Sequence, residues 1–90
     1  MKVQFHGGLR NTTGQNSIEV DLSPGATVKT LLESLVKKVP TLKPEIINAQ
    51  GELSARVHFF VNGVDVPCLA QKLDTPLQEE AKVTIFPVAG

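Results

Sequence analysis

The chain has 90 residues, enough for one small domain with a single core. Hydrophobic residues make up 41% of it and charged residues 20%, which excludes disordered and collagen-like classes, and no apolar run is long enough for a membrane span or a signal peptide. Nine Lys and Arg balance nine Asp and Glu, and the single cysteine cannot form an internal disulfide. We therefore expect a packed cytoplasmic domain that binds neither nucleic acid nor membrane.

The first part of the chain predicts two strands and a helix. Residues 2–9 alternate apolar and polar side chains, as a half-buried strand does, and a second alternating run covers 18–22. Turn-forming residues at 11–16 join the two runs as a β-hairpin. Thr27 is a suitable N-cap for a helix over 28–39, whose apolar positions form one stripe.

The second part predicts a long loop and three strands. Residues 40–56 read as a loop with one helical turn near 45–48, because prolines and a glycine interrupt a stretch of modest apolar content. A strand at 57–61 is followed by an Asn-Gly turn and a short partner at 64–66. After an irregular connection, 83–86 forms a last strand that ends before Pro87.

This order of elements predicts an α+β fold, in which one main helix lies across one face of a sheet of four to five strands. Residues 1–90 form a single domain, with a short extended tail at about 87–90. The side chains expected to face the helix are those of Val3, Phe5, Ile18, Val20, Val57, Phe59, Val61, Val83 and Ile85.

Four segments carry a resemblance to a known family. They are 25–32 (GATVKTLL), 61–66 (VNGVDV), 74–77 (DTPL) and 83–90 (VTIFPVAG). In this order and spacing they resemble the small sulfur-carrier subunit of molybdopterin synthase over the whole chain. The resemblance implies a ubiquitin-like β-grasp fold with a mixed sheet.

The resemblance also implies an activity at the carboxylate of Gly90. An activating enzyme of the E1 type would use ATP to form an acyl adenylate there, and sulfur would then replace one oxygen to give a nucleophilic thiocarboxylate. The large subunit of the synthase would receive the tail, with Pro87, Val88 and Ala89 contacting the partner. Glycine has no side chain, so such a tail fits a narrow channel. The chain itself would bind no cofactor and perform no turnover alone.

Two features depart from the family pattern. Family members generally end in two glycines, whereas this sequence shows Gly90 alone, which leaves open whether a further glycine follows in the cell. Glu80-Ala81 stands where the family has a Gly-Asp turn before the last strand. A positive φ at Glu80 would cost on the order of 1 kcal/mol, unless the loop has a different shape.

His6, Phe60 and Phe86 fall on the outward face by the alternation, and a β-grasp sheet would bring their strands together. Exposed aromatic side chains are typical of a surface that a partner covers, so we predict that the three form a docking surface for the activating enzyme and the large subunit. The alternative is that a loop of the same chain covers Phe60 or Phe86.

Other candidate residues receive structural explanations. Cys68 is predicted to be a small buried hydrophobic residue rather than a nucleophile. His6 and His58 are predicted to be solvated strand residues, and no metal site is expected because no further ligands have suitable spacing. Gly7 and Gly8 are expected to mark a bulge or a close backbone approach.

Three other functions stay open at this point. A ubiquitin-like protein modifier would use the same activation and end in an isopeptide bond to a lysine. A plain interaction module would have no terminal chemistry. The thiamine-pathway sulfur carrier shares the fold and the ending, although its members are usually shorter in the stretch that corresponds to 40–56.

Overall fold

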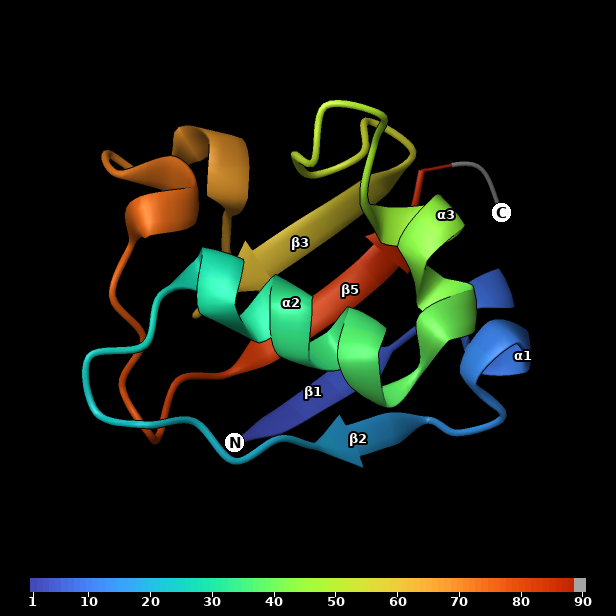
Figure 1. The fold of residues 1–90 in the computed structure, drawn as a ribbon, viewed down its shortest axis with the longest axis horizontal. Helices are drawn as coiled ribbons and strands as arrows, with labels where there is room; N and C mark the ends of the chain where they lie inside the picture. Colours follow the sequence, from blue (N-terminus) through green and yellow to red (C-terminus); the bar gives the residue numbers. More distant parts are fainter. Residues whose placement is uncertain (89–90) are drawn as a thin grey trace.

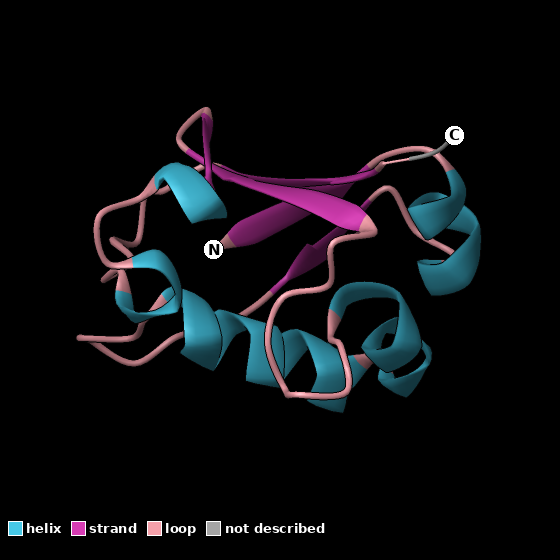
Figure 2. Ribbon diagram, turned by 90° about the horizontal axis from the view of Figure 1, so that it is seen from above, coloured by secondary structure: helices cyan, strands magenta, loops and turns pink. Residues whose placement is uncertain are grey.

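The computed structural model describes residues 1–88, in which five strands form one mixed sheet (Figure 1). The strands, in spatial order β2-β1-β5-β3-β4, are β1 (Lys2–Phe5), β2 (Ser17–Glu19), β3 (Val57–Val61), β4 (Val64–Asp65) and β5 (Val83–Pro87). The central pair β1 and β5 runs parallel, and the other neighbouring pairs are antiparallel. Figure 2 shows the long helix lying across one face of this sheet. The predicted α+β fold is confirmed.

The described residues also form three α-helices and three short 3-10 turns. They are α1 (Gly8–Thr13), α2 (Val28–Lys38) and α3 (Lys43–Ile46), with turns at Pro40–Leu42, Val66–Cys68 and Lys72–Asp74. Helix α2 begins where the sequence predicts, because Thr27 forms a capping box with Thr30 in which each side chain accepts the other's backbone N–H at 3.3 Å. Its last turn carries two lysines, which complement the helix dipole.

The core lies between α2 and the inner face of the sheet. All nine side chains predicted to face inward are buried, and Val3, Phe59, Val83 and Ile85 are completely so. The helix contributes its apolar stripe, with Val28, Leu31, Leu32 and Leu35 buried. Burial of each such aliphatic side chain contributes roughly 1.5–3 kcal/mol before chain entropy is counted. The predicted core is therefore confirmed.

The predicted hairpin at the start of the chain is wrong in its connection. The first strand ends at Phe5, and helix α1 occupies residues expected to be strand and turn. Gly7 has φ 59° and ψ −140°, a conformation that favours glycine and turns the chain out of the sheet, and Gly14 ends α1 in the left-handed conformation with φ 73°. Leu9 is buried as expected, but it reaches the core from a helix. Strands β1 and β2 still pair antiparallel.

Residues 40–56 are more ordered than the predicted loop. Leu42 and Ile46 are completely buried, and their i, i+4 spacing places both on the inner side of a helical segment. The helical turn thus lies at Lys43–Ile46, two residues earlier than predicted. The following loop is closed by Asn48, whose Oδ1 accepts the backbone N–H groups of Gln50 and Glu52.

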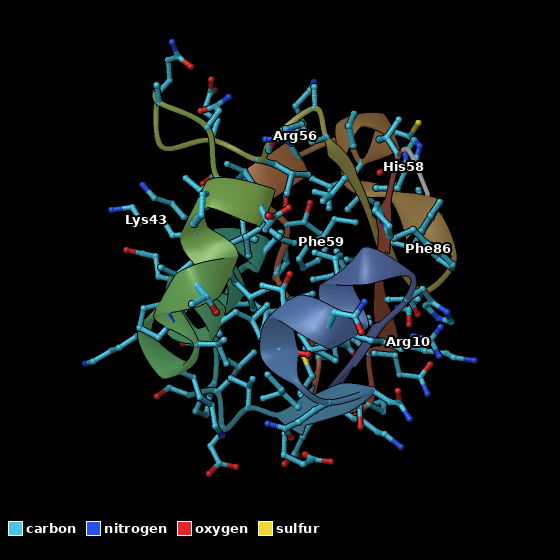
Figure 3. All side chains as sticks on the ribbon, turned by 90° about the vertical axis from the view of Figure 1, so that its right-hand side faces the viewer. Arg10, Lys43, Arg56, His58, Phe59 and Phe86 are labelled. Atoms are coloured by element: carbon cyan, nitrogen blue, oxygen red, sulfur yellow. The ribbon has the colours of Figure 1, made fainter. Side chains whose placement is uncertain are left out.

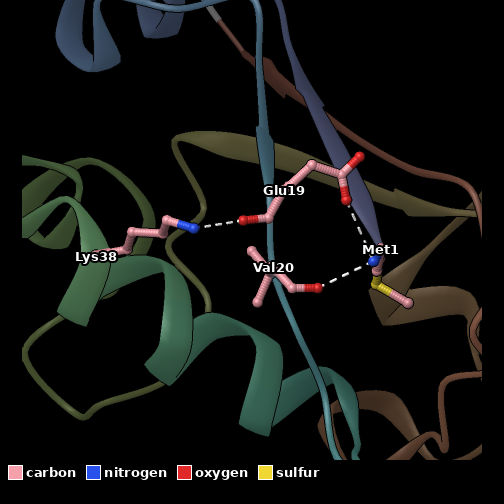
Figure 4. A network of polar contacts seen from close by, with 4 residues as sticks. All are labelled: Met1, Glu19, Val20 and Lys38. Atoms are coloured by element: carbon pink, nitrogen blue, oxygen red, sulfur yellow. Dashed lines mark hydrogen bonds and ion pairs between the residues drawn. The ribbon is translucent and has the colours of Figure 1, made fainter.

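The edge strand β2 is tied to its surroundings by polar contacts (Figure 4). Lys38 at the end of α2 donates from Nζ to the carbonyl oxygen of Glu19 at 2.6 Å. The Met1 ammonium donates to the carbonyl oxygen of Val20 at 3.0 Å and lies 3.5 Å from Oε2 of Glu19. A lysine that occupies an outward carbonyl makes an edge strand a poorer template for another strand.

Candidate functional site

Four rings lie together on the outer face of the sheet: His6 follows β1, Phe86 lies on β5, and Phe60 and His58 both lie on β3. We call these four side chains the aromatic row. His6 stacks on Phe86 with ring centroids 4.3 Å apart and an interplanar angle of 12°. Phe86 meets Phe60 edge to face at 5.5 Å, and Phe60 lies 5.9 Å from His58. Both geometries are favourable for aromatic pairs.

The sheet register explains why these rings meet. Ile85 of β5 pairs with Phe5 of β1 on one side and with Phe59 of β3 on the other, and all three side chains face the core. The next residue in each strand must therefore point outward. This relation places Phe86 and Phe60 on the solvent side, with His6 directly after β1.

The structure thus brings together the three residues that the alternation placed on the outward face. His6 is exposed, and the two phenylalanines are half-buried. Their docking role stays a prediction. Covering an apolar ring that is partly in water lowers the free energy, so the arrangement suits a contact surface.

His58 and Asp65 extend this surface, and the sequence analysis missed their role. Nδ1 of His58 lies 3.0 Å from Oδ2 of Asp65, which is a hydrogen bond and, when the imidazole is protonated, an ion pair. The hairpin register places Asp65 opposite Phe60, which lies two residues after His58 on the same face of β3. The short Asn62-Gly63 turn sets this register, so the turn was the sequence feature from which the His58–Asp65 contact could have been predicted.

The chain leaves the sheet next to the aromatic row. Strand β5 extends through Pro87, which pairs with Val57, so the strand ends one residue later than predicted. The backbone N–H of Val88 donates to the carbonyl of Arg56 at 2.8 Å, and the Val88 side chain is 52% exposed. Ala89 and Gly90, the other predicted tail residues, lie outside the described residues.

Several smaller predictions are corrected. Cys68 is exposed rather than buried, because the 3-10 turn Val66–Cys68 directs Val66 into the core instead. Gly7 marks a turn into α1 and not a bulge. Within residues 1–88, the non-glycine residues with positive φ are Asn62 and Lys72, so Glu80 avoids the strain that a Gly-Asp type of turn would impose and its loop has another shape.

The part of the chain that the structure covers has no group of three or more His, Cys, Asp or Glu that could hold a metal ion. No helix in residues 1–88 is long and apolar enough to cross a membrane.

Comparison with protein families gives one match, described as the ThiS family, over residues 3–90. The chain belongs to the ThiS family. It is therefore a member of the ubiquitin-like β-grasp sulfur-carrier group, as the sequence resemblance indicated. A search of curated proteins found no match for this ThiS-family chain.

Solved structures similar to the ThiS-family chain carry different names. The small archaeal modifier protein 1 of Methanosarcina acetivorans is 28% identical, with TM-score 0.82 and coverage of 99% of this chain and 93% of that one. A chain of the BexX/CysO complex of Amycolatopsis orientalis is 26% identical, with TM-score 0.80 and coverage of 99% of this chain and 97% of that one. A putative molybdopterin converting factor subunit 1 of Pyrococcus furiosus is 27% identical, with TM-score 0.76 and coverage of 96% and 93%.

Proposed function

We propose that this chain is the sulfur-carrying small subunit of molybdopterin synthase and supplies sulfur for molybdenum cofactor biosynthesis in the cytoplasm. Membership of the ThiS family and similarity to the Pyrococcus furiosus protein support the proposal. The observation that carries it is the course of β5, which bears Phe86 of the aromatic row and leads within four residues to Gly90. A partner that covers Phe86 contacts a residue only four positions before Gly90, which supports delivery of the tail to that partner.

The proposed chemistry takes place at the carboxylate of Gly90. An E1-like activating enzyme joins this carboxylate to the AMP part of ATP and releases pyrophosphate. Hydrosulfide from the sulfur donor then attacks the acyl carbon and expels AMP, which leaves the thiocarboxylate and releases one proton. The ATP belongs to the activating enzyme, and this chain binds no cofactor of its own. The large subunit accepts the tail, with Pro87, Val88 and Ala89 against its surface, and transfers the sulfur.

Intact-mass measurement tests this proposal. The chain is incubated with the activating enzyme, ATP and a sulfur donor, and a mass gain equal to the exchange of one oxygen for sulfur is expected. Two forms are compared, one ending at Gly90 and one with a further glycine, because one residue changes the reach of an extended tail by about 3.3–3.6 Å. If neither form gains this mass, the proposal is wrong.

A protein modifier is the second candidate, and the similarity to a small archaeal modifier protein favours it. The same adenylate would then react with the amino group of a target lysine, forming an isopeptide bond and releasing AMP. Recovery of the chain joined to lysines of other proteins in cell extract would support this function. A stable complex with the synthase large subunit, without such conjugates, would support the carrier.

A further inference from the structure

The turn between β3 and β5's other neighbour, β4, is tied to β5 by a side chain. Val61 pairs with Val83, so the next antiparallel pair along β3 and β5 is Asn62 and Lys82. The backbone N–H of Asn62 donates to the carbonyl oxygen of Lys82 at 2.8 Å, as in a sheet. The return bond runs from the backbone N–H of Lys82 to Oδ1 of the Asn62 side chain, also at 2.8 Å. The amide oxygen thus takes the place of a backbone carbonyl.

The backbone conformation of the turn explains this replacement. Asn62 and Gly63 have φ 51° and 85°, and they join Val61 to Val64 in a two-residue hairpin turn. The turn leads the chain toward β4, on the opposite side of β3 from β5. Asparagine adopts positive φ more readily than other side chains, and its amide can imitate a backbone acceptor. The position therefore favours asparagine for two separate reasons.

The same dipeptide is chemically labile. In an Asn-Gly sequence the backbone nitrogen of glycine can attack Cγ of asparagine, because glycine has no side chain to hinder the approach. The bond between this nitrogen and Cγ forms, the bond from Cγ to the amide nitrogen breaks, and ammonia leaves with the proton of the glycine N–H. Water then opens the cyclic imide at one of its two carbonyl carbons and gives aspartate or isoaspartate. Asn62 and Gly63 are both exposed to the water that this reaction consumes.

The folded turn holds the reacting groups apart. The Lys82 contact directs Oδ1 of Asn62 toward β5, whereas Gly63 leads the chain toward β4. We propose that Asn62 is a deamidation site that the fold protects, and that its amide reacts with the Gly63 nitrogen only after the contact with Lys82 has opened. The inference goes beyond the proposed function and does not depend on the chemistry at Gly90.

The two products affect the hairpin differently. Aspartate keeps an oxygen that can accept the Lys82 N–H, whereas isoaspartate runs the backbone through the former side chain and lengthens the turn by one carbon. The hairpin register then changes, and the hydrogen bond between His58 and Asp65 is lost. Arg56, labelled in Figure 3, lies just before β3, at the end away from the turn, and its carbonyl accepts the N–H of Val88. The contact at the start of the tail is therefore kept.

Deamidation rates at single residues test the protection. The chain is incubated at mildly alkaline pH, either folded or in concentrated guanidinium chloride, and peptide mass mapping gives the rate at each asparagine. In the unfolded chain Asn62 should react faster than Asn16, since glycine follows the one and serine the other. Folding should slow the reaction at Asn62 about tenfold or more. Asn16 is exposed and lies outside the strands, so its rate should change less.

Two substitutions at one position test the contact itself. Asn62→Asp keeps an acceptor for the Lys82 N–H, and Asn62→Gly removes it while still allowing positive φ. Hydrogen exchange at the Lys82 amide should be about five- to tenfold faster in Asn62→Gly than in Asn62→Asp, as expected for the loss of one hydrogen bond. Both residue types suit this kind of turn, and thermal unfolding shows that each variant is folded.

The inference is overturned if Asn62 reacts equally fast in the folded and unfolded chain, or if the Lys82 amide exchanges equally fast in the two variants. It is also overturned if a purified isoaspartate form keeps the contact between His58 and Asp65 in its NMR spectra. Thiocarboxylate formation at Gly90 is measured separately, so failure of the proposed function leaves this inference standing, and the reverse holds as well.

Discussion

The imidazole of His6 stacks on the ring of Phe86 with centroids 4.3 Å apart, although 79 positions separate the two residues along the chain. The contact depends on the parallel pairing of β1 and β5, which sets the first strand beside the last. The aromatic row therefore exists only in the folded chain, and its members can be changed one at a time while the core below stays intact.

Replacement of Phe86 by Ala should separate docking from folding. The ring is half-buried and contacts other rings of the row, so its loss removes aromatic contacts worth about 0.5–1.5 kcal/mol each and leaves no enclosed cavity. We expect a small decrease in melting temperature and a loss of affinity for the activating enzyme of at least tenfold, as for a central interface residue. Calorimetry and a binding titration measure the two effects.

Phe59→Ala is the matched control for this variant. Phe59 lies in the adjacent register position but is completely buried, so its truncation leaves a cavity and should lower the free energy of unfolding by about 3–5 kcal/mol. Equal destabilisation by Phe86→Ala and Phe59→Ala would mean that Phe86 belongs to the core and is covered by its own chain.

The turn between β3 and β4 should be sensitive to a methyl group at Gly63. Gly63 has φ 85°, where an L side chain is strained, although a Cβ there would meet no atom within 4 Å. Gly63→Ala should therefore lower the free energy of unfolding by about 1 kcal/mol. Gly8→Ala, which also meets no atom within 4 Å but lies in helix α1, should be neutral or stabilising. Denaturant unfolding of both variants distinguishes strain from crowding, and the same loss at both positions would contradict this explanation.

Lys38→Met should weaken the attachment of α2 to the edge strand. The change removes the donor to the Glu19 carbonyl but keeps most of the aliphatic length, so a loss of about 0.5–1.5 kcal/mol is expected. The freed carbonyl also lets β2 pair more readily with a strand of another molecule, which predicts increased self-association at high concentration. Lys37→Met is the control, and sedimentation of both variants gives the readout. Indistinguishable behaviour of the two would show that the Lys38 contact has no energetic role in solution.

Thr27→Ala should destabilise helix α2 at its start. The side chain accepts the N–H of Thr30, and alanine leaves that donor without its side-chain acceptor and removes the contact between the two hydroxyls, whereas the Thr27 N–H can still donate to the Thr30 hydroxyl. A decrease of about 1 kcal/mol in the free energy of unfolding is typical for loss of an N-cap. Thr27→Ser keeps the hydroxyl and should restore most of this stability. If serine were as destabilising as alanine, the cap would not explain the effect.

The sequence predicted the elements whose pattern is set by burial on one side. Alternation placed Val57, Phe59 and Val61 inward, and the apolar stripe gave the helix from Val28 with its cap at Thr27. The same alternation placed Phe60 and Phe86 outward, so the centre of the aromatic row was predictable. In each case the spacing of apolar residues along the chain matches which side chains are buried in the fold, so the pattern was sufficient to predict the element.

The predictions fail where a single backbone conformation, or a contact with a residue far along the chain, determines the local structure. Alternation continued through Gly7 to Leu9, but a left-handed glycine ended the strand and Leu9 reached the core from a helix instead. The apolar pattern around Ile46 is too short to predict that this side chain is buried. Alternation placed His58 outward, but the identity of its partner Asp65 depends on the hairpin register and on the side-chain directions.

The central place of β5 has a consequence for synthesis in the cell. Because β5 lies between β1 and β3, the sheet cannot close until the residues of β5 have left the ribosome. A chain truncated before β5 would leave the inner strands without their common neighbour and expose them to proteases. The aromatic row thus forms only after the segment that carries Phe86 has been translated.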